Sequence, residues 1–162
     1  MGGENRMDQG FDGGCACGRV RYRLETPPMF VHCCHCRDCQ RQTGSAFVIN
    51  ALIETDRIAL PGAPPEPVRM PTESGRPHDI YRCPACRTAL WSDYGGRPLL
   101  RFVRVGTLDQ PASLSPDVHI YVRSKLPWVQ LPGCVPAFEA YYDARTLWPN
   151  ASLERRRAVL GR

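Results

Sequence analysis

Cysteine is the residue best placed to do chemistry in this sequence, with nine thiols among 162 residues. Eight of them fall in three short groups: Cys15-Ala16-Cys17, the run from Cys33 to Cys39, and Cys83-Pro84-Ala85-Cys86. The first ten residues lack the apolar core of a secretory signal, so we expect a cytoplasmic protein in a compartment that keeps thiols reduced. Clustered cysteines in that setting predict metal thiolate sites rather than disulfides.

The two outer groups have the spacing of one closed zinc site. Cys83 and Cys86 are separated by two residues, as in a zinc knuckle, and such a pair needs two more ligands. Cys15 and Cys17 can supply them, because residues i and i+2 of an extended chain point to the same side. Four thiolates leave no coordination position for chemistry, so this zinc would be structural. The alternative is that Cys83 and Cys86 form a redox pair.

The middle group predicts a site of a different kind. If the chain is extended up to Cys36, then Cys34 and Cys36 face one side, and Cys39 returns to them three residues later. Cys33 would lie on the opposite face as a small buried apolar side chain. A rival set, Cys33, Cys36 and Cys39, would need a turned path instead of a strand. Three thiolates leave one position open for substrate, as in catalytic zinc sites. Alternatively, a fourth side chain closes a second structural site, the possible ligands being His32, His35, His119 and Cys134.

The elements that must position these thiols are predicted to be mainly strands. Sixteen prolines and fourteen glycines work against long helices. Apolar and polar residues alternate over several short segments bounded by turn residues, which is typical of half-buried strands. The predicted strands are 19–25, 29–33, 46–53, 78–82, 90–93, 99–105 and 118–122. Short helices are expected over 37–43 and 151–160, and the proline-rich segment 61–71 is expected to be a loop with edge-strand character.

Charge permits a second function class, that of a binding module. The formal net charge is +5 and the pI is near 8.8, which would attract anions weakly. A zinc-stapled domain could use Arg19, Arg21, Arg23 and the Glu154–Arg157 tail to bind nucleic acid or a protein partner. Nucleic acid is disfavoured, because these arginines alternate with core positions and no stacking aromatics lie between them. No stretch is long and apolar enough to span a membrane, so no membrane association is expected.

Four sequence blocks resemble one known family. The blocks "GGCACGRVRY", "CCHCRDCQRQTGSAF", "YRCPACRTALW" and "DVHIYVRSKLPW" span Gly13 to Trp128 and are similar to the glutathione-dependent formaldehyde-activating enzymes, a family related to centromere protein V. The resemblance implies a β-tent fold of small antiparallel sheets pinned by zinc. It also implies a structural zinc on the outer cysteine pairs and a catalytic zinc on Cys34, Cys36 and Cys39. The implied activity is that of a carbon–sulfur lyase, an S-(hydroxymethyl)glutathione synthase that joins the small molecules glutathione and formaldehyde.

Several residues could contact such substrates. On an extended "HIYVRSK" segment, His119, Tyr121 and Arg123 share one face. Arg123 and Lys125 could pair with the two carboxylates of glutathione, and His119 could shuttle a proton. Gly44 and Ser45 could offer backbone N–H groups or a hydroxyl to the substrate oxygen. Alternatively, Arg123 and Lys125 are solvated surface charges and His119 is a structural histidine. Gly44 and Ser45 would then form a simple turn.

The sequence also predicts how the chain is divided. Residues 1–12 are expected to form an N-terminal tail, residues 13–142 a zinc-binding formaldehyde-activating-like domain, and residues 143–162 a C-terminal tail or short helix. A third functional hypothesis is a zinc or redox buffer in which Cys33 and Cys34 form a labile disulfide under oxidation.

Overall fold

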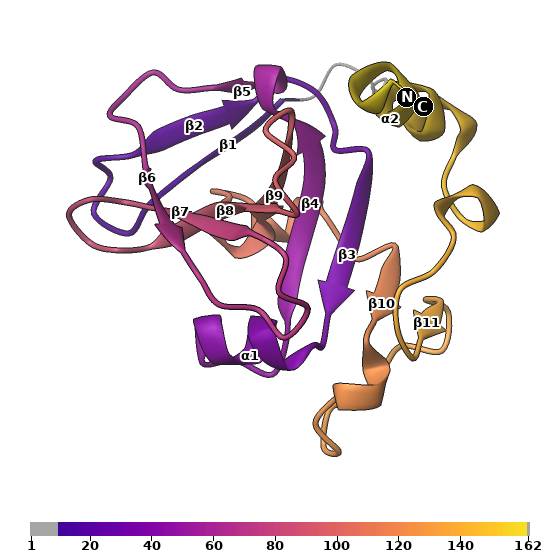
Figure 1. The fold of residues 1–162 in the computed structure, drawn as a ribbon. Helices are drawn as coiled ribbons and strands as arrows, with labels where there is room; N and C mark the ends of the chain where they lie inside the picture. Colours follow the sequence, from indigo (N-terminus) through magenta and orange to yellow (C-terminus); the bar gives the residue numbers. More distant parts are fainter. Residues whose placement is uncertain (1–9, 162) are drawn as a thin grey trace, which may run out of the picture.

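The protein is built on two β-sheets, which a computed structural model describes over residues 10–161 (Figure 1). The smaller sheet has the strand order β1-β2-β5, and the larger has the order β11-β10-β3-β4-β9-β8-β7-β6. The strands are β1 (Phe11–Gly14), β2 (Arg21–Leu24), β3 (Phe30–Cys34), β4 (Val48–Glu54), β5 (Ile58–Ala59), β6 (Glu66–Arg69), β7 (His78–Arg82), β8 (Ala89–Tyr94), β9 (Leu100–Arg104), β10 (Val118–Ile120) and β11 (Ala137–Phe138).

Helices contribute little to the described part of the chain. Within residues 10–161 there are two α-helices, α1 (Arg37–Thr43) and α2 (Asn150–Leu160). The short 3₁₀ segments are Thr55–Arg57, Val105–Thr107, Pro111–Ser113, Val122–Ser124 and Ala144–Thr146. The predicted mainly β fold with few short helices is therefore confirmed. Figure 1 shows α1 at the end of β3 where the chain turns back into β4, whereas α2 lies near the opposite end.

The larger sheet departs in one respect from the expected antiparallel arrangement. Its pairs from β3 through β6 are antiparallel, but β10 runs parallel to both β3 and β11. A parallel neighbour needs a long connection rather than a hairpin, and more than eighty residues separate β3 from β10. The register sets Cys33 beside His119 and Cys34 beside Ile120.

The alternation pattern located the long strands and missed the short ones. β7 and α1 have the predicted bounds, β6 is an edge strand inside the proline-rich segment, and the other predicted strands differ by a few residues at their ends. β1, β5 and β11 were not predicted. β1 reads "FDGG" and the other two have two residues each, so none carries a period-two pattern long enough to recognise.

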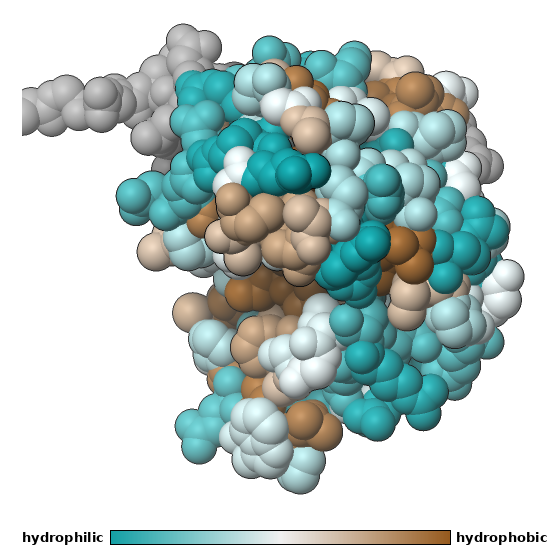
Figure 2. All heavy atoms as spheres, turned by 90° about the vertical axis from the view of Figure 1, so that its left-hand side faces the viewer, coloured by the Kyte–Doolittle hydropathy of each residue, from teal (hydrophilic) through white to brown (hydrophobic). Residues whose placement is uncertain are grey.

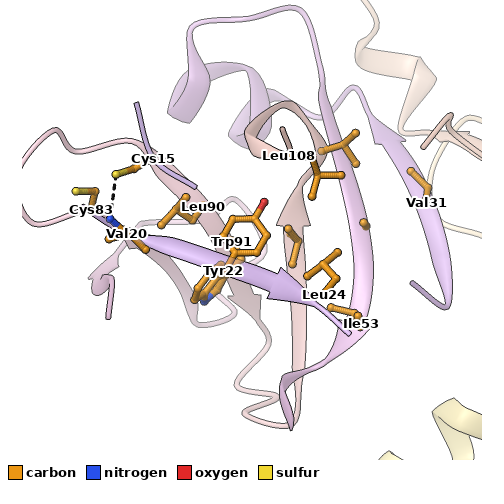
Figure 3. Packing of buried hydrophobic residues seen from close by; sticks show 13 residues of the cluster. Cys15, Val20, Tyr22, Leu24, Val31, Ile53, Cys83, Leu90, Trp91 and Leu108 are labelled. Carbon is orange, nitrogen blue, oxygen red and sulfur yellow. Dashed lines mark hydrogen bonds between the residues drawn. The ribbon is translucent and has the colours of Figure 1, made fainter. Parts of the chain in front are cut away.

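The main core lies between the two sheets and reaches one cysteine cluster. On β2, Tyr22 and Leu24 are buried and Arg23 is exposed, as the alternation predicts. Tyr22 packs edge-on against Trp91 of β8, with ring centroids 5.5 Å apart. In Figure 3, Cys15 and Cys83 lie together at one end of this cluster of buried side chains. This core therefore supports the sulfur atoms of the outer cysteine pairs.

The face seen in Figure 2 is largely hydrophilic, with hydrophobic residues gathered in separate patches. Among the helices of residues 10–161, none has both the length and the apolar character that crossing a membrane requires.

Candidate functional site

The outer cysteine pairs meet in space. The Sγ atoms of Cys15, Cys17, Cys83 and Cys86 all lie within 4.8 Å of one another. Cys15 and Cys17 are 3.5 Å apart, and Cys17 and Cys83 are 3.8 Å apart. Zinc–sulfur bonds of about 2.3 Å in a tetrahedron place the sulfurs about 3.8 Å apart, so the donor set and its spacing suit zinc.

Turns, not an extended strand, bring these thiols together. The chain folds back after Cys15, with a carbonyl of Cys15 accepting from Gly18 N–H at 3.1 Å and Gly18 at φ +77°. The thiol of Cys15 accepts the Val20 N–H at 3.3 Å. On the other arm, Arg87 takes the left-handed conformation with φ +61° directly after Cys86. The extended path assumed from sequence for Cys15 and Cys17 is therefore wrong, although the two sulfurs do face the same point.

The middle cysteines form a second cluster. The Sγ atoms of Cys34, Cys36 and Cys39 lie within 4.8 Å of one another. Cys34 ends β3, and Cys36 keeps an extended backbone at the N-cap of α1, where its sulfur accepts the Cys39 N–H at 3.4 Å. Within residues 10–161, no fourth histidine, cysteine or carboxylate joins this group. His35 and His119 belong to a separate group with Cys33, and Cys134 is exposed.

Crowding of the three sulfurs polarises their thiols. Hydrogen bonding from Cys34 and then Cys39 lowers the pKa of Cys36, even though burial opposes the charge. The same contact with Cys36 raises the pKa of Cys34. Negative charge therefore gathers on one sulfur first, and a cation bound between the three would stabilise the remaining thiolates.

Arg104 of β9 is a buried positive charge beside these sulfurs. It is 6% exposed, it donates to Asn50 Oδ1 and, at 2.7 Å, to Gln42 Oε1, and its Nε has no partner among the described residues. Burial lowers the pKa of Arg104, while the thiols of Cys39 and Cys34 oppose that effect. No carboxylate in the described chain forms an ion pair with it. The cysteine cluster, when ionised, is therefore the negative group that acts on Arg104.

The three-cysteine cluster opens on a cavity of about 360 Å³. Aromatic and apolar side chains form part of its wall, namely Phe102, Ile120, Tyr121, Tyr94 and Tyr141. Polar and charged residues also line it: His32, Arg37, Asp38, Asn50, Glu73, Ser74, His78, Ser92, Arg104, Arg123 and Ser124. The cavity thus combines soft sulfur donors, charges of both signs and a partly apolar wall, which suits a small charged organic ligand.

A family model for the glutathione-dependent formaldehyde-activating enzyme matches residues 10–124, which is most of the chain. The chain belongs to the glutathione-dependent formaldehyde-activating enzyme family. A protein of Halomonas elongata described as a "Putative glutathione-dependent formaldehyde-activating enzyme" is 27% identical over 126 residues, covering 75% of this chain and 80% of that protein. A crystal structure of a Rhodobacter sphaeroides protein aligns with a TM-score of 0.44 at 16% identity, covering 78% of this chain and 99% of the other.

In this member of the formaldehyde-activating family, some of the predicted glutathione contacts line the cavity and others do not. Arg123 lines the cavity. Lys125 does not, and its Nζ instead donates to the carbonyls of Leu126 and Val129 at 3.2 and 2.7 Å. Gly44 and Ser45 also lie outside the lining; the Gly44 N–H closes α1 and the Ser45 N–H donates to Thr43.

His119 is the clearest departure from the sequence interpretation. It does not line the cavity, but lies 3.0 Å from His35 on the other face of β3. The predicted shared face of His119, Tyr121 and Arg123 fails because β10 ends at Ile120. Tyr121 then adopts φ +57°, and residues 122–124 form a 3₁₀ turn. Period-two alternation does not continue through such a break.

Four polar residues of the cavity, His32, Arg37, His78 and Arg104, were not predicted from sequence to contact substrate, and His32 was named only as an alternative metal ligand. His32 lies two residues before Cys34 on the same face of β3, a spacing that could have identified it. Its Nε2 is 2.9 Å from Tyr142 Oη, and its Nδ1 is buried with no partner in residues 10–161. Burial lowers the pKa of His32 to about 4, so the ring is neutral near pH 7. His78 and Arg104 carried no local signal, because only the fold brings them to the three thiols, whereas Arg37 follows Cys36 directly in the sequence.

Three of the six arginines proposed for a binding module form ion pairs within the described chain. Arg21 pairs with Asp109, Arg23 with Asp12, and Arg155 with Glu54. Internal pairing of this kind reduces the charge that the arginines can offer to a partner.

Proposed function

We propose that this protein is a zinc-dependent carbon–sulfur lyase that reversibly forms S-(hydroxymethyl)glutathione from glutathione and formaldehyde. The observation that carries the proposal is a cluster of three cysteine sulfurs, without a fourth ligand in the described chain, at the wall of a cavity of about 360 Å³. Membership of the formaldehyde-activating family supports the same reaction.

Two zinc ions would serve different purposes. Cys15, Cys17, Cys83 and Cys86 would hold a structural ion, and Cys34, Cys36 and Cys39 a catalytic one. Thiolates select soft or borderline ions such as zinc over magnesium or calcium, so both donor sets suit the metal. When bound, zinc in the open site lowers the pKa of an incoming thiol and keeps it as the nucleophilic thiolate.

The charges around the cavity match those of glutathione. That tripeptide carries two carboxylates and one ammonium group. Arg123 and Arg37 can pair with the carboxylates, and Asp38 and Glu73 can accept from the ammonium group; all four line the cavity. Arg37 replaces Lys125 in this proposal, because the Lys125 amine is held by two backbone carbonyls.

The reaction forms one bond and moves one proton. The glutathione sulfur donates an electron pair to the carbonyl carbon, the C=O π electrons pass to oxygen, and that oxygen gains the proton lost from the thiol. Trp148 Nε1–H donates to Tyr142 Oη at 2.6 Å, which leaves the phenol proton for Nε2 of His32. In that tautomer Nδ1 of His32 carries a hydrogen without an acceptor among the described residues, and a substrate oxygen that reached this N–H would be stabilised as an alkoxide.

Arg104 would keep the thiolate cluster charged. Its guanidinium lies beside three sulfurs and is held by neutral amide oxygens of Asn50 and Gln42. The main gain in rate comes from holding thiolate and aldehyde together, since the uncatalysed addition is already easy.

Exchange spectroscopy tests the proposal. Metal-loaded protein is mixed with glutathione and formaldehyde, and the exchange between free aldehyde and adduct is followed by NMR. We expect exchange faster than in buffer, lost in Cys36→Ser and retained in Cys134→Ser, which removes an exposed cysteine far from the cluster in sequence. Exchange at the buffer rate with wild-type protein, for glutathione and other thiols alike, would contradict the proposal.

The second candidate is the non-catalytic binding module for nucleic acid or a protein partner. The net charge of +5 favours it. The internal pairing of Arg21, Arg23 and Arg155 weighs against it. Nucleic-acid binding that falls steeply with added salt would support this candidate over the enzyme.

A further inference from the structure

A third group of metal-ligating side chains lies on the opposite face of β3 from the three-cysteine cluster. It consists of Cys33, His35 and His119, whose ligand atoms all lie within 4.8 Å of one another. The two proposed zinc sites and the proposed reaction use none of the three, which the sequence offered as alternative ligands of the second zinc. All three side chains are buried, with exposures of 1%, 0% and 6%. Nucleophilic use of Cys33 on a substrate is therefore disfavoured, and a different role must be sought.

Backbone geometry brings the three residues together. β10 runs parallel to β3 with His119 directly beside Cys33. The chain stays extended past Cys34, and the His35 N–H donates to the Ile120 carbonyl at 3.0 Å. Cys33 and His35 are two residues apart and so point to the same face, which is the face that His119 shares. Alternation along β3 thus sends successive side chains to two separate clusters.

The distances suit a metal ion. His35 Nε2 lies 3.0 Å from His119 Nδ1 and 3.6 Å from Cys33 Sγ. A tetrahedral ion with bonds of about 2.1 Å to nitrogen and about 2.3 Å to sulfur separates two nitrogens by about 3.4 Å, and nitrogen from sulfur by about 3.6 Å. Only small shifts would be needed to bring all three atoms into coordination.

We propose that Cys33, His35 and His119 form a third metal site, which takes a d¹⁰ ion of borderline or soft character, Zn²⁺ or Cu⁺. One thiolate and two imidazoles select such ions over Mg²⁺ and Ca²⁺. Binding replaces the thiol proton of Cys33 with the ion, and that proton leaves to solvent. Burial otherwise keeps this thiol protonated, since it raises the pKa of Cys33 to about 12.

Charge distinguishes the two ions. Thiolate, two neutral imidazoles and Cu⁺ sum to zero, whereas Zn²⁺ leaves one positive charge in a buried site. A net positive charge is costly to bury, so the burial of all three side chains favours the monovalent ion.

The proposed metal site would join β3, which carries Cys34 of the three-cysteine cluster, to β10, which leads to the cavity. Cys33 and His35 come from the β3 segment, and His119 comes from β10. Tyr121 and Arg123, which line the cavity, follow β10 directly. An ion here would fix β10 against β3 and so hold those two side chains in place, without touching the substrate.

Metal counting with matched variants tests the inference. Wild-type protein is expressed in medium containing zinc and copper, and bound metals are measured by plasma mass spectrometry. We expect Cys33→Ala and His119→Gln each to lose about one metal equivalent per chain relative to wild type, while Cys134→Ala loses none. The element lost identifies the ion. Because the count is a difference, it does not depend on whether the proposed reaction is correct.

Cadmium NMR keeps the test decisive if a variant folds poorly. Wild-type protein refolded with ¹¹³Cd²⁺ should give one resonance at a mixed nitrogen and sulfur position, coupled to imidazole ¹⁵N, besides the sulfur-rich resonances. Equal metal content in wild type and folded variants would overturn the site. So would imidazole ¹⁵N shifts showing only a neutral hydrogen-bonded histidine pair in the metal-loaded wild type.

Discussion

The two all-cysteine clusters differ in how they are assembled. The four-cysteine cluster joins Cys15 and Cys17 to Cys83 and Cys86, across more than sixty residues of sequence. The three-cysteine cluster takes all its sulfurs from one stretch of six residues, Cys34 to Cys39. Cys17 of the four-cysteine cluster is exposed, and none of the cavities described for residues 10–161 is lined by this cluster. The three-cysteine cluster lines a cavity of about 360 Å³.

This contrast suggests that the four-cysteine cluster contributes to stability and the three-cysteine cluster to catalysis. If both clusters bind zinc as proposed, the cluster that closes a long loop and adjoins the core at Cys15 and Cys83 would hold the fold together. The cluster held by one local turn would then lose its metal with little effect on the rest of the chain. Substitutions that act on one cluster and spare the other therefore test whether the two roles are separate.

Cys83→Ser should have the largest effect, on folding. A structural zinc contributes on the order of 10 kcal/mol, comparable to the whole free energy of unfolding of a domain. We expect the variant to lose its cooperative thermal transition in circular dichroism. The control is Cys134→Ser, which should melt as wild type does. A cooperative transition within a few degrees of wild type for Cys83→Ser would show that the four-cysteine cluster does not hold the fold.

Cys36→Ser should remove activity and leave the fold. Cys36 contributes one sulfur to the open cluster and caps α1 by accepting the Cys39 N–H. Serine can keep the cap but is a poor ligand for a soft ion. We expect the loss of about one zinc equivalent, exchange at the buffer rate, and an unchanged far-ultraviolet spectrum. Collapse of the fold together with the loss of zinc would mean that the two clusters are not separable.

The sequence predicted the residues of both clusters and the longer strands that carry them. Its success at Cys34 and Cys36 came from one physical rule, the alternation of side chains along an extended chain. The same rule failed at two other places. At Cys15 and Cys17 a turn replaces the strand, and at Tyr121 a left-handed residue ends β10. Both failures occur where a glycine or a residue with positive φ interrupts the extended backbone. The alternation of apolar and polar residues gives no sign of such an interruption.

The cavity could not have been predicted in the same way. Arg104, Asn50 and His78 come from three different strands and meet the cysteines only because of the order β3-β4-β9-β8-β7. Strand order depends on long-range pairing, of which a single sequence carries no record. Lys125 shows the opposite error. Its charge and its place just after a predicted strand suggested a contact with glutathione, but its amine donates to backbone carbonyls instead.

Arg104→Gln should weaken catalysis more than stability. Removing the guanidinium takes away a buried positive charge beside the three sulfurs. We expect a loss comparable to that of a hydrogen bond to a charged group, about 1.5–3 kcal/mol. We expect kcat/KM to fall by roughly 10- to 100-fold. Arg104→Lys keeps the charge and should recover part of the loss. Equal loss in both variants would assign the effect to the contacts with Asn50 and Gln42 instead of the charge.

Arg123→Ala should have the smallest effect and one confined to substrate binding. Arg123 lies at the cavity wall, with its guanidinium 5.8 Å from the centre of the Tyr121 ring and no carboxylate paired with it in the described chain. An exposed ion pair with a substrate carboxylate is worth about 1 kcal/mol, which corresponds to a rise in KM for glutathione of roughly fivefold at constant kcat. Glutathione monoethyl ester, which lacks one carboxylate, provides the matched substrate. If Arg123 binds that carboxylate, the variant and wild type should have similar KM values for the ester. An equal rise in KM for both substrates would mean that Arg123 does not bind the carboxylate that the ester lacks. Arg37 would then be the better candidate, since it lines the same cavity from the first turn of α1.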